Sequence, residues 1–302
     1  MRTYEKIETV FNRDTIGTKK LILGDFRNET IEFLQNNEWE FTEKVDGTNV
    51  RVCWDGHKVS FAGRTERAEL PTVIMIAKDI KDNGGEAELF MPYIPNARMD
   101  RVHSDEDVFT LKWFADEINR CEFSRVVVFD PHSDVAPALI DRCEVHTSIR
   151  EICKVIEENK PDVIYFPDAG AMKRYEGPVH WALDRAKCSA YIIHGDKKRD
   201  WATGKILGLD VTGYPPKKGK VLMIDDICSY GGTMYYSAKK LKELGAGDID
   251  IYVSHCENSI LDKERGHLFD NPDLIHMVYT TDSIFTGHHD KITVLEHHWD
   301  ED

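Results

Sequence analysis

The sequence predicts an α/β protein with two parallel sheets, preceded by a β-rich segment. From about Asp107 onward, apolar runs of strand length alternate with amphipathic runs of helix length. This alternation is typical of parallel sheets with helices on both faces, whose ligands bind at the carboxyl ends of the strands. The runs are numerous enough for two such sheets, divided near Lys160. Before residue 70 the pattern is instead that of short antiparallel strands.

The first alternating units precede this division. One apolar stripe predicts a helix over Asp107–Arg120, and the apolar run after it predicts a buried strand over Arg125–Asp130. A second stripe predicts a helix over Thr147–Asn159, with Thr147 or Ser148 as its N-cap.

The later units repeat the pattern. A helix is predicted over Thr233–Leu244, closed by Gly245 in the position that glycine favours after a helix. Short apolar runs predict strands at Val163–Phe166, Tyr191–His194, Val221–Ile224 and Ile251–Ser254.

The segment before residue 70 predicts a small antiparallel arrangement, with strands at Trp39–Lys44, Val50–Trp54 and Lys58–Ala62. Asp55-Gly56 is a typical hairpin turn between the last two. Pro71 weakly marks the end of this segment. The sequence thus predicts three parts, at residues 1–70, 71–160 and 161–302.

Composition limits the class of protein. The net charge of −15 over 302 residues argues against a generally basic surface for nucleic acid. A local phosphate site remains possible, because backbone N–H groups can build one. We expect a cytoplasmic protein without a membrane partner, since no apolar run approaches the roughly 18 residues of a membrane span. The seven cysteines form no C-x-x-C pair, which favours free thiols.

The strongest chemical signal is the segment from Val221 to Thr233, which reads as an apolar strand, two acids, a small-residue turn and a helix start. The acids Asp225 and Asp226 stand at the strand end, where they could hold the hydroxyl groups of a ribose. Backbone N–H groups and hydroxyls at the helix start favour a phosphate. The residues that would present these groups are Ser229, Gly231, Gly232 and Thr233.

This segment resembles the PRPP-binding motif that phosphoribosyltransferases and PRPP synthetases share. It departs from the motif at Ser229, where an acid is usual. Ser229 can still bind phosphate, but a role as a base at that position is lost.

Four further segments resemble the ribose-phosphate diphosphokinase (PRPP synthetase) family, phage type. In Pro92–Arg101, the resemblance implies that Arg98 and Asp100 bind ATP, while Met99 replaces a common glutamine. In Phe129–Ser133, it implies that His132 meets Mg²⁺ and ATP.

The other two segments belong to the second half of the chain. Phe166–Arg174 is similar to the family element P-D-A-G-x-x-K-R, in which Asp168 would hold Mg²⁺. His194–Arg199 is similar to the catalytic flexible loop, which implies that Lys197 and Arg199 neutralise charge in the transition state.

The resemblance covers about 71–302 and implies two type I phosphoribosyltransferase-like domains. It further implies Mg²⁺-dependent transfer of diphosphate from ATP to ribose 5-phosphate, giving PRPP and AMP for nucleotide or NAD biosynthesis. Small-molecule phosphates would be the partners, and the protein would be a homo-oligomer. Three alternatives stay open: transfer to ADP-ribose in NAD salvage, a phosphoribosyltransferase, and a non-catalytic homologue.

A second resemblance lies before residue 70. Lys44-Val45-Asp46-Gly47, with the surrounding residues 4–71, resembles the N-terminal motif region of RNA ligases, in which Lys44 would be adenylated. The later nucleotide-binding motifs of ligases do not follow, so we expect no active ligase. Alternatively, Lys44–Val52 serves the synthetase fold itself, in the place of that family's F-x-D-G-E segment.

Overall fold

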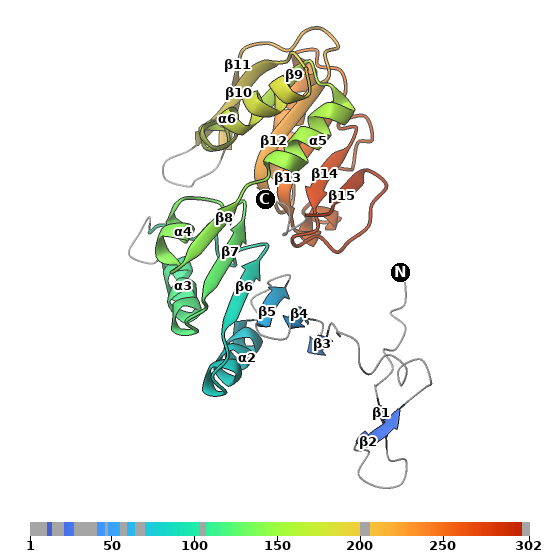
Figure 1. Cartoon of the computed structure of the whole chain (residues 1–302). Helices are drawn as coiled ribbons and strands as arrows, with labels where there is room; N and C mark the ends of the chain where they lie inside the picture. The colour runs from blue at the N-terminus through green and yellow to red at the C-terminus, as the bar shows by residue number, and fades with distance from the viewer. Residues whose placement is uncertain are drawn as a thin grey trace.

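The computed structural model confirms an α/β fold with two mainly parallel sheets, drawn one above the other in Figure 1. A separate antiparallel pair is formed by β1 (Phe11–Arg13) and β2 (Leu21–Phe26). The structure describes side chains for residues 70–102, 107–196 and 210–297. It describes the backbone for residues 11–13, 21–26, 41–45, 48–54, 59–63, 70–102, 107–199 and 206–297.

The first sheet has six strands and begins in the segment before residue 70. Strands β3 to β5 pair antiparallel, as predicted, although the Asp55-Gly56 turn lies outside the described residues. β5 then pairs in parallel with β6, so the early segment continues this sheet across the division expected at residue 70. The strands, in pairing order, are β3 (Phe41–Val45), β4 (Thr48–Trp54), β5 (Val59–Gly63), β6 (Ala87–Met91), β7 (Arg125–Phe129) and β8 (Cys143–His146).

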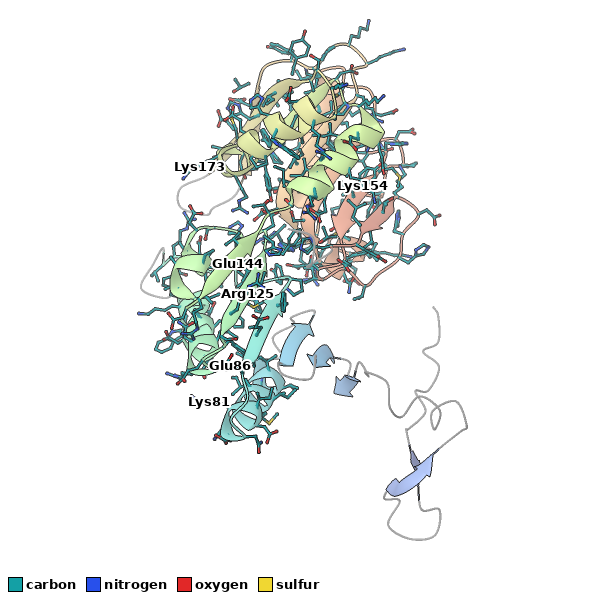
Figure 2. All side chains as sticks on the ribbon, viewed as in Figure 1. Lys81, Glu86, Arg125, Glu144, Lys154 and Lys173 are labelled. Atoms are coloured by element: carbon teal, nitrogen blue, oxygen red, sulfur yellow. The ribbon has the colours of Figure 1, made fainter. Side chains whose placement is uncertain are left out.

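Among the residues that the structure describes, three helices accompany the first sheet, namely α2 (Leu70–Asp82), α3 (Thr110–Arg120) and α4 (Val135–Leu139). The predicted apolar stripe of α3 is buried in the core with β6 and β7, because its side chains recur once per helical turn. On the last two strands, Arg125 donates to both carboxylate oxygens of Glu144 at 2.7 Å, and Figure 2 shows the two side by side.

The second sheet has seven strands. All neighbouring strands pair in parallel except β10 and β11, which form an antiparallel ribbon. β10, β12 and β13 extend beyond the predicted runs, because pairing continues where the sequence turns polar. The strands, in pairing order, are β11 (Ile206–Thr212), β10 (Tyr191–Arg199), β9 (Val163–Phe166), β12 (Val221–Cys228), β13 (Ile249–Cys256), β14 (Val278–Thr281) and β15 (Ile292–Leu295).

Helices cover both faces of the second sheet. Along β9, Val163 and Tyr165 pack into the cluster that contains α7 (Gly232–Glu243). Ile164 and Phe166 point the other way, into the cluster built by α5 (Ile149–Asn159) and α6 (Ala169–Arg185). A short 3₁₀ helix, η2 (Asn258–Leu261), follows β13. Because α5 packs on the second sheet, the part of the chain that belongs to this sheet begins before the division expected at residue 160.

The start of α5 differs from the prediction in one respect. Ser148 occupies the N-cap position, but its hydroxyl makes no capping bond. It donates instead to the carboxylate of Asp130, at the end of β7, at 3.0 Å. The predicted capping residue therefore links the second half of the chain to the first sheet.

The helices and the cysteines bear on two expectations from the sequence. Among the residues whose structure is described, no helix is both long and apolar enough to cross a bilayer. The six cysteines with described side chains are all free thiols.

The carboxyl ends of the parallel strands of both sheets meet at the junction between the two halves (Figure 1). Arg98, after β6, and His132, after β7, contact residues at the end of β12. Residues from both sheets thus border the same space.

Candidate active site

A cavity of about 800 Å³ lies at this junction. Its walls come from the loops after β6 and β7 on one side, and from α6 and the loops after β9 and β12 on the other. This is where parallel α/β sheets bind ligands. The predicted site residues that line it are Arg98, His132, Asp168, Asp225, Asp226 and Thr233.

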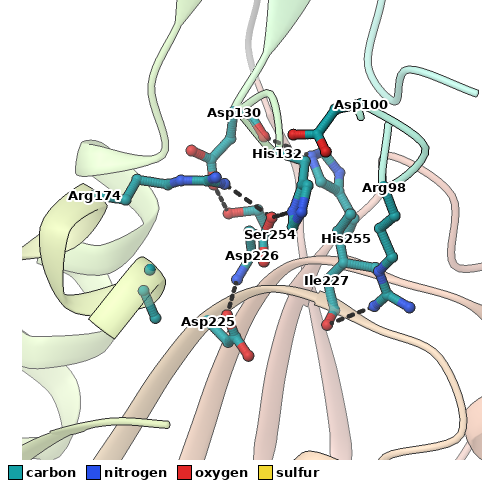
Figure 3. A network of polar contacts seen from close by, with 12 residues as sticks. Arg98, Asp100, Asp130, His132, Arg174, Asp225, Asp226, Ile227, Ser254 and His255 are labelled. Carbon is teal, nitrogen blue, oxygen red and sulfur yellow. Dashed lines mark hydrogen bonds and ion pairs between the residues drawn. The ribbon is translucent and has the colours of Figure 1, made fainter. Parts of the chain in front are cut away.

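Asp226 is the central charge of the cavity (Figure 3). Its carboxylate Oδ2 lies 2.5 Å from Nδ1 of His132 and accepts a bond of 2.8 Å from Arg174. The residue is only 7% exposed. Burial alone would raise the pKa of this carboxyl, but hydrogen bonding and charge from His132, together with the Arg174 guanidinium, hold the pKa well below its usual range. Asp226 is therefore an anion at neutral pH, positioned between the two halves.

Asp225, one residue earlier, lines the same cavity. Its Oδ1 accepts a bond of 3.0 Å from the backbone N–H of Asp226. This bond fixes the two carboxylates relative to each other. The pair thus presents negative charge at the edge where a sugar would lie.

The turn after β12 has the geometry of an anion site. Gly231 adopts φ 76°, and a Cβ at this position would lie 3.3 Å from Cβ of Leu268, so both conformation and space favour glycine. α7 begins at Gly232, and its N-cap residue, Gly231, makes no side-chain capping bond. The first N–H groups of a helix without such a cap attract an anion. The phosphate position next to Thr233, which lines the cavity, stays a prediction.

Arg98 connects the first sheet to this turn. Its guanidinium donates to Oγ of Ser229 and to the carbonyl oxygen of Ile227, both at 3.1 Å. The resemblance assigns Arg98 to ATP, and the structure shows that Arg98 contacts the turn that the sequence assigned to the sugar phosphate. Met99, its neighbour, is 48% exposed and lines a second cavity of about 500 Å³ that Arg98 also borders.

The other two predicted site acids, Asp100 and Asp168, each accept hydrogen bonds from neighbouring residues. Burial raises the pKa of Asp100, but the hydrogen bond of 2.9 Å from Arg101 and the positive charge of that side chain outweigh it and lower the pKa. Asp168 caps α6, because its Oδ1 accepts from the backbone N–H groups of Gly170 and Ala171 at 3.1 and 3.0 Å. Both carboxylates are thereby held at fixed positions.

Comparison with known proteins agrees with the fold. No family model matches the chain. It is 27% identical over 194 residues to a ribose-phosphate pyrophosphokinase of Saccharolobus solfataricus, covering 61% of this chain and 62% of that protein. It is 26% identical over 234 residues to the enzyme of the same name from Thermococcus kodakarensis, covering 72% and 77%.

The chain belongs to the ribose-phosphate pyrophosphokinase (PRPP synthetase) family. The fold agrees, since a crystal structure of phosphoribosylpyrophosphate synthetase from Mycobacterium smegmatis superimposes with a TM-score of 0.60. That match covers 86% of each chain at 18% identity, which supports the fold alone.

Three predicted residues lie where the structure describes the backbone but not the side chain. Lys197 and Arg199 were expected in a loop after a strand, but their backbone continues β10 and pairs with β11 opposite Leu209 and Ile206. They therefore lie on an antiparallel ribbon. Lys44 lies in β3, opposite Asn49 of β4. The roles of these side chains remain predictions.

The structure adds residues that the sequence predictions did not assign. Arg174 was inside the family element P-D-A-G-x-x-K-R, and Asp130 was two residues before His132, so both stood in motifs already noted. Ser254 and His255, at the end of β13, stood in no recognised motif. Figure 3 shows these four residues around the site.

Proposed function

We propose that this PRPP synthetase family member transfers diphosphate from Mg-ATP to the anomeric hydroxyl of ribose 5-phosphate, releasing PRPP and AMP. The observation that carries the proposal is the contact between His132 and Asp226 across one cavity. The sequence assigned His132 to ATP and Asp226 to the sugar, and the two assignments came from separate segments. Their contact supports two substrates binding side by side, which a diphosphate transfer requires.

The sugar half of the proposal rests on the end of β12. The phosphate of ribose 5-phosphate would bind at the start of α7, next to Gly231 and Thr233. Asp225 and Asp226 would accept hydrogen bonds from the ribose hydroxyls, because both carboxylates stand at the strand end. This arrangement would direct the anomeric oxygen toward the side of His132.

The ATP half rests on the loops after β6 and β7. Arg98 and His132 would bind the phosphates of ATP, and the cavity of about 500 Å³ beside Met99 offers room for the base. In the reaction, the anomeric oxygen forms a bond to the β-phosphorus, and the bond to the oxygen shared with AMP breaks. Lys197 and Arg199, on the β10–β11 ribbon, would neutralise the charge that develops there.

Magnesium fits the residues present. No group of three potential ligand side chains is arranged to hold a metal among the residues that the structure describes. Mg²⁺ commonly takes only one or two carboxylates and completes its shell with water and substrate phosphates. Asp168 borders the cavity, and His132, whose Nδ1 contacts Asp226, has Nε2 for a ligand. Bound there, the ion would neutralise phosphate charge.

We also propose a revised division of the chain. The continuous first sheet supports one domain over 41–146, and the second sheet with α5 supports another over 147–297. Lys44 then belongs to the first sheet. This favours a role of Lys44–Val52 in the synthetase fold over a remnant of a ligase.

A second acceptor, ADP-ribose, is favoured by one observation beside the phosphate turn. The guanidinium of Arg265 lies 4.4 Å from the ring centroid of Tyr230, and Asp262 holds it with bonds of 3.0 and 3.2 Å. A fixed cation and an aromatic ring next to a phosphate position could bind a second phosphate or a base. The reaction with ADP-ribose would be the same diphosphate transfer from ATP, with a different acceptor.

The deciding experiment measures AMP release from Mg-ATP with ribose 5-phosphate or ADP-ribose as the acceptor. We expect release that requires one of these acceptors. Arg265→Ala should lower the rate with ADP-ribose and leave ribose 5-phosphate unaffected if the larger ester is the substrate. Acceptor-independent release, or none with either acceptor, would contradict the proposed function.

A further inference from the structure

The carboxylate of Asp130 gathers hydroxyl groups from three elements of the second half of the chain. Its Oδ2 accepts a bond of 3.0 Å from Ser148, which precedes α5, and one of 2.5 Å from the phenol of Tyr175 on α6. It accepts a third from Ser254 on β13. Asp130 itself follows β7 of the first sheet and is 5% exposed. One buried oxygen atom thus connects the two halves at three points.

The backbone of Asp130 is held as well. Its N–H donates to the carbonyl of His146 at 2.8 Å, and its own carbonyl accepts from Nε2 of His255 at 3.1 Å. Burial lowers the pKa of His255, which keeps its ring neutral, so that Nε2 can donate while Nδ1 accepts from Ser283 at 2.8 Å. These bonds fix the peptide groups on both sides of the residue.

The conformation of Asp130 indicates that this attachment imposes a strained backbone. Its φ is 41°, in the left-handed region that residues other than glycine seldom adopt. Such conformations persist where the surrounding contacts determine them, and they cluster at functional sites. Here the chain turns at Asp130 and brings His132, two residues later, against Asp226.

We propose that Asp130 is a positioning residue that sets the register of the two halves and thereby places His132 against the sugar site. The proposal rests on the proposed function, since it concerns the alignment of ATP with the acceptor. Asp130 acts through His132 and not on substrate. Three hydroxyl donors occupy Oδ2, so a metal-ligand role would have to use Oδ1, and the Mg²⁺ requirement measured below tests that alternative.

The matched variants come from two buried tyrosine–serine pairs. Tyr175→Phe and Ser254→Ala each remove one hydroxyl that Asp130 accepts. The control variants are Tyr165→Phe and Ser237→Ala, which break the bond of 3.3 Å between two buried hydroxyls within the second half. Each pair removes buried hydroxyl contacts, but only the first pair joins the halves.

The first measurement is the steady-state rate of AMP release per folded protein. We expect Asp130→Ala to lower kcat on the order of 100-fold, the scale for a misalignment of about 1 Å. The Michaelis constants for ATP and the acceptor, and the Mg²⁺ concentration for half-maximal rate, should stay within about 2-fold of wild type, because each substrate keeps its own contacts. Tyr175→Phe and Ser254→Ala should lower kcat less, and the controls should not change it.

Several outcomes would overturn the proposal. A raised Mg²⁺ requirement would make Asp130 a metal ligand. An unchanged kcat in Tyr175→Phe and Ser254→Ala, or an equal loss in the control variants, would leave only a general contribution to stability. The single-hydroxyl variants keep the proposal testable even if Asp130→Ala does not fold.

A second measurement separates this proposal from the proposed function. If wild-type protein releases no AMP with either acceptor, the function fails, but the attachment can still be tested by hydrogen exchange at the backbone N–H groups of residues 132–134. We expect faster exchange there in Tyr175→Phe than in Tyr165→Phe. Equal exchange in both would refute the attachment independently of activity.

Discussion

Asp226→Asn tests the central charge of the site while keeping the shape of the side chain. The carboxylate contacts His132 and Arg174, and we propose that it also accepts a ribose hydroxyl. Hydrogen bonds to charged groups are worth about 1.5–3 kcal/mol and neutral ones about 0.5–1.5, so each contact should weaken by roughly 1 kcal/mol. We therefore expect a loss of about 2 kcal/mol in unfolding free energy from the two protein contacts.

The same weakening should also appear in the affinity for the acceptor. Weakening the bond to the sugar by roughly 1 kcal/mol should raise the acceptor Michaelis constant about 5-fold, since about 1.4 kcal/mol corresponds to a factor of ten. The assay is AMP release as a function of ribose 5-phosphate concentration, with binding checked by calorimetry.

Asp250→Asn is the matched control for that assay. Asp250 is a buried acid on β13 that pairs with His276 at 2.8 Å and Lys220 at 3.5 Å, opposite Leu222 near the start of β12. It lies at the amino end of the strands, away from the cavity. The control should lose stability and keep its Michaelis constant. An unchanged Michaelis constant in Asp226→Asn, or an equal rise in Asp250→Asn, would refute the sugar assignment.

Four further predictions concern other parts of the molecule. Lys197→Ala and Arg199→Ala should each lower kcat far more than they raise either Michaelis constant, as steady-state kinetics would show. Incubation with α-labelled ATP and Mg²⁺ should leave no covalent label on Lys44, and a label lost in Lys44→Ala would contradict this. Gly231→Ala should lower the unfolding free energy by roughly 1 kcal/mol or more, because of its φ of 76°, and thermal unfolding would show this as a lower midpoint temperature. The low pKa of Asp226 contributes stability above the unfolded carboxyl pKa of about 3.9, so acid titration should show this contribution lost only below about pH 4.

Much of the second sheet could be predicted from the sequence, because its strands are buried on both faces. β9 matches its predicted bounds, and α7 begins one residue before the prediction. α6 was missed, since Gly170, Gly177 and Pro178 interrupt its helical pattern, although Asp168 caps its start. The pairing of β5 with β6 was also missed, because strand pairing across an intervening helix leaves no local signal.

The candidate site could be predicted only in part, for a related reason. Strand-end motifs identified His132 and Asp226, since each stands beside its own strand. Their mutual contact depends on how the two halves pack, and they are 94 residues apart in the chain. Asp130 and Ser254 are separated by 124 residues, and a serine at the end of a strand carries no signal by itself. Long-range partners of this kind need the folded structure.

The order of the strands along the chain has a consequence for how the molecule can be cut. All strands of the first sheet end at or before His146, and all strands of the second begin after Pro161, so the chain crosses between the sheets once, through α5. A break between His146 and Thr147 would leave every strand pairing of both sheets intact. We expect residues 1–146 and 147–302, produced as two polypeptides, to reassemble into one particle whose assembly depends on the hydroxyl groups around Asp130. Such a pair would allow isotope labels to be placed on one half alone.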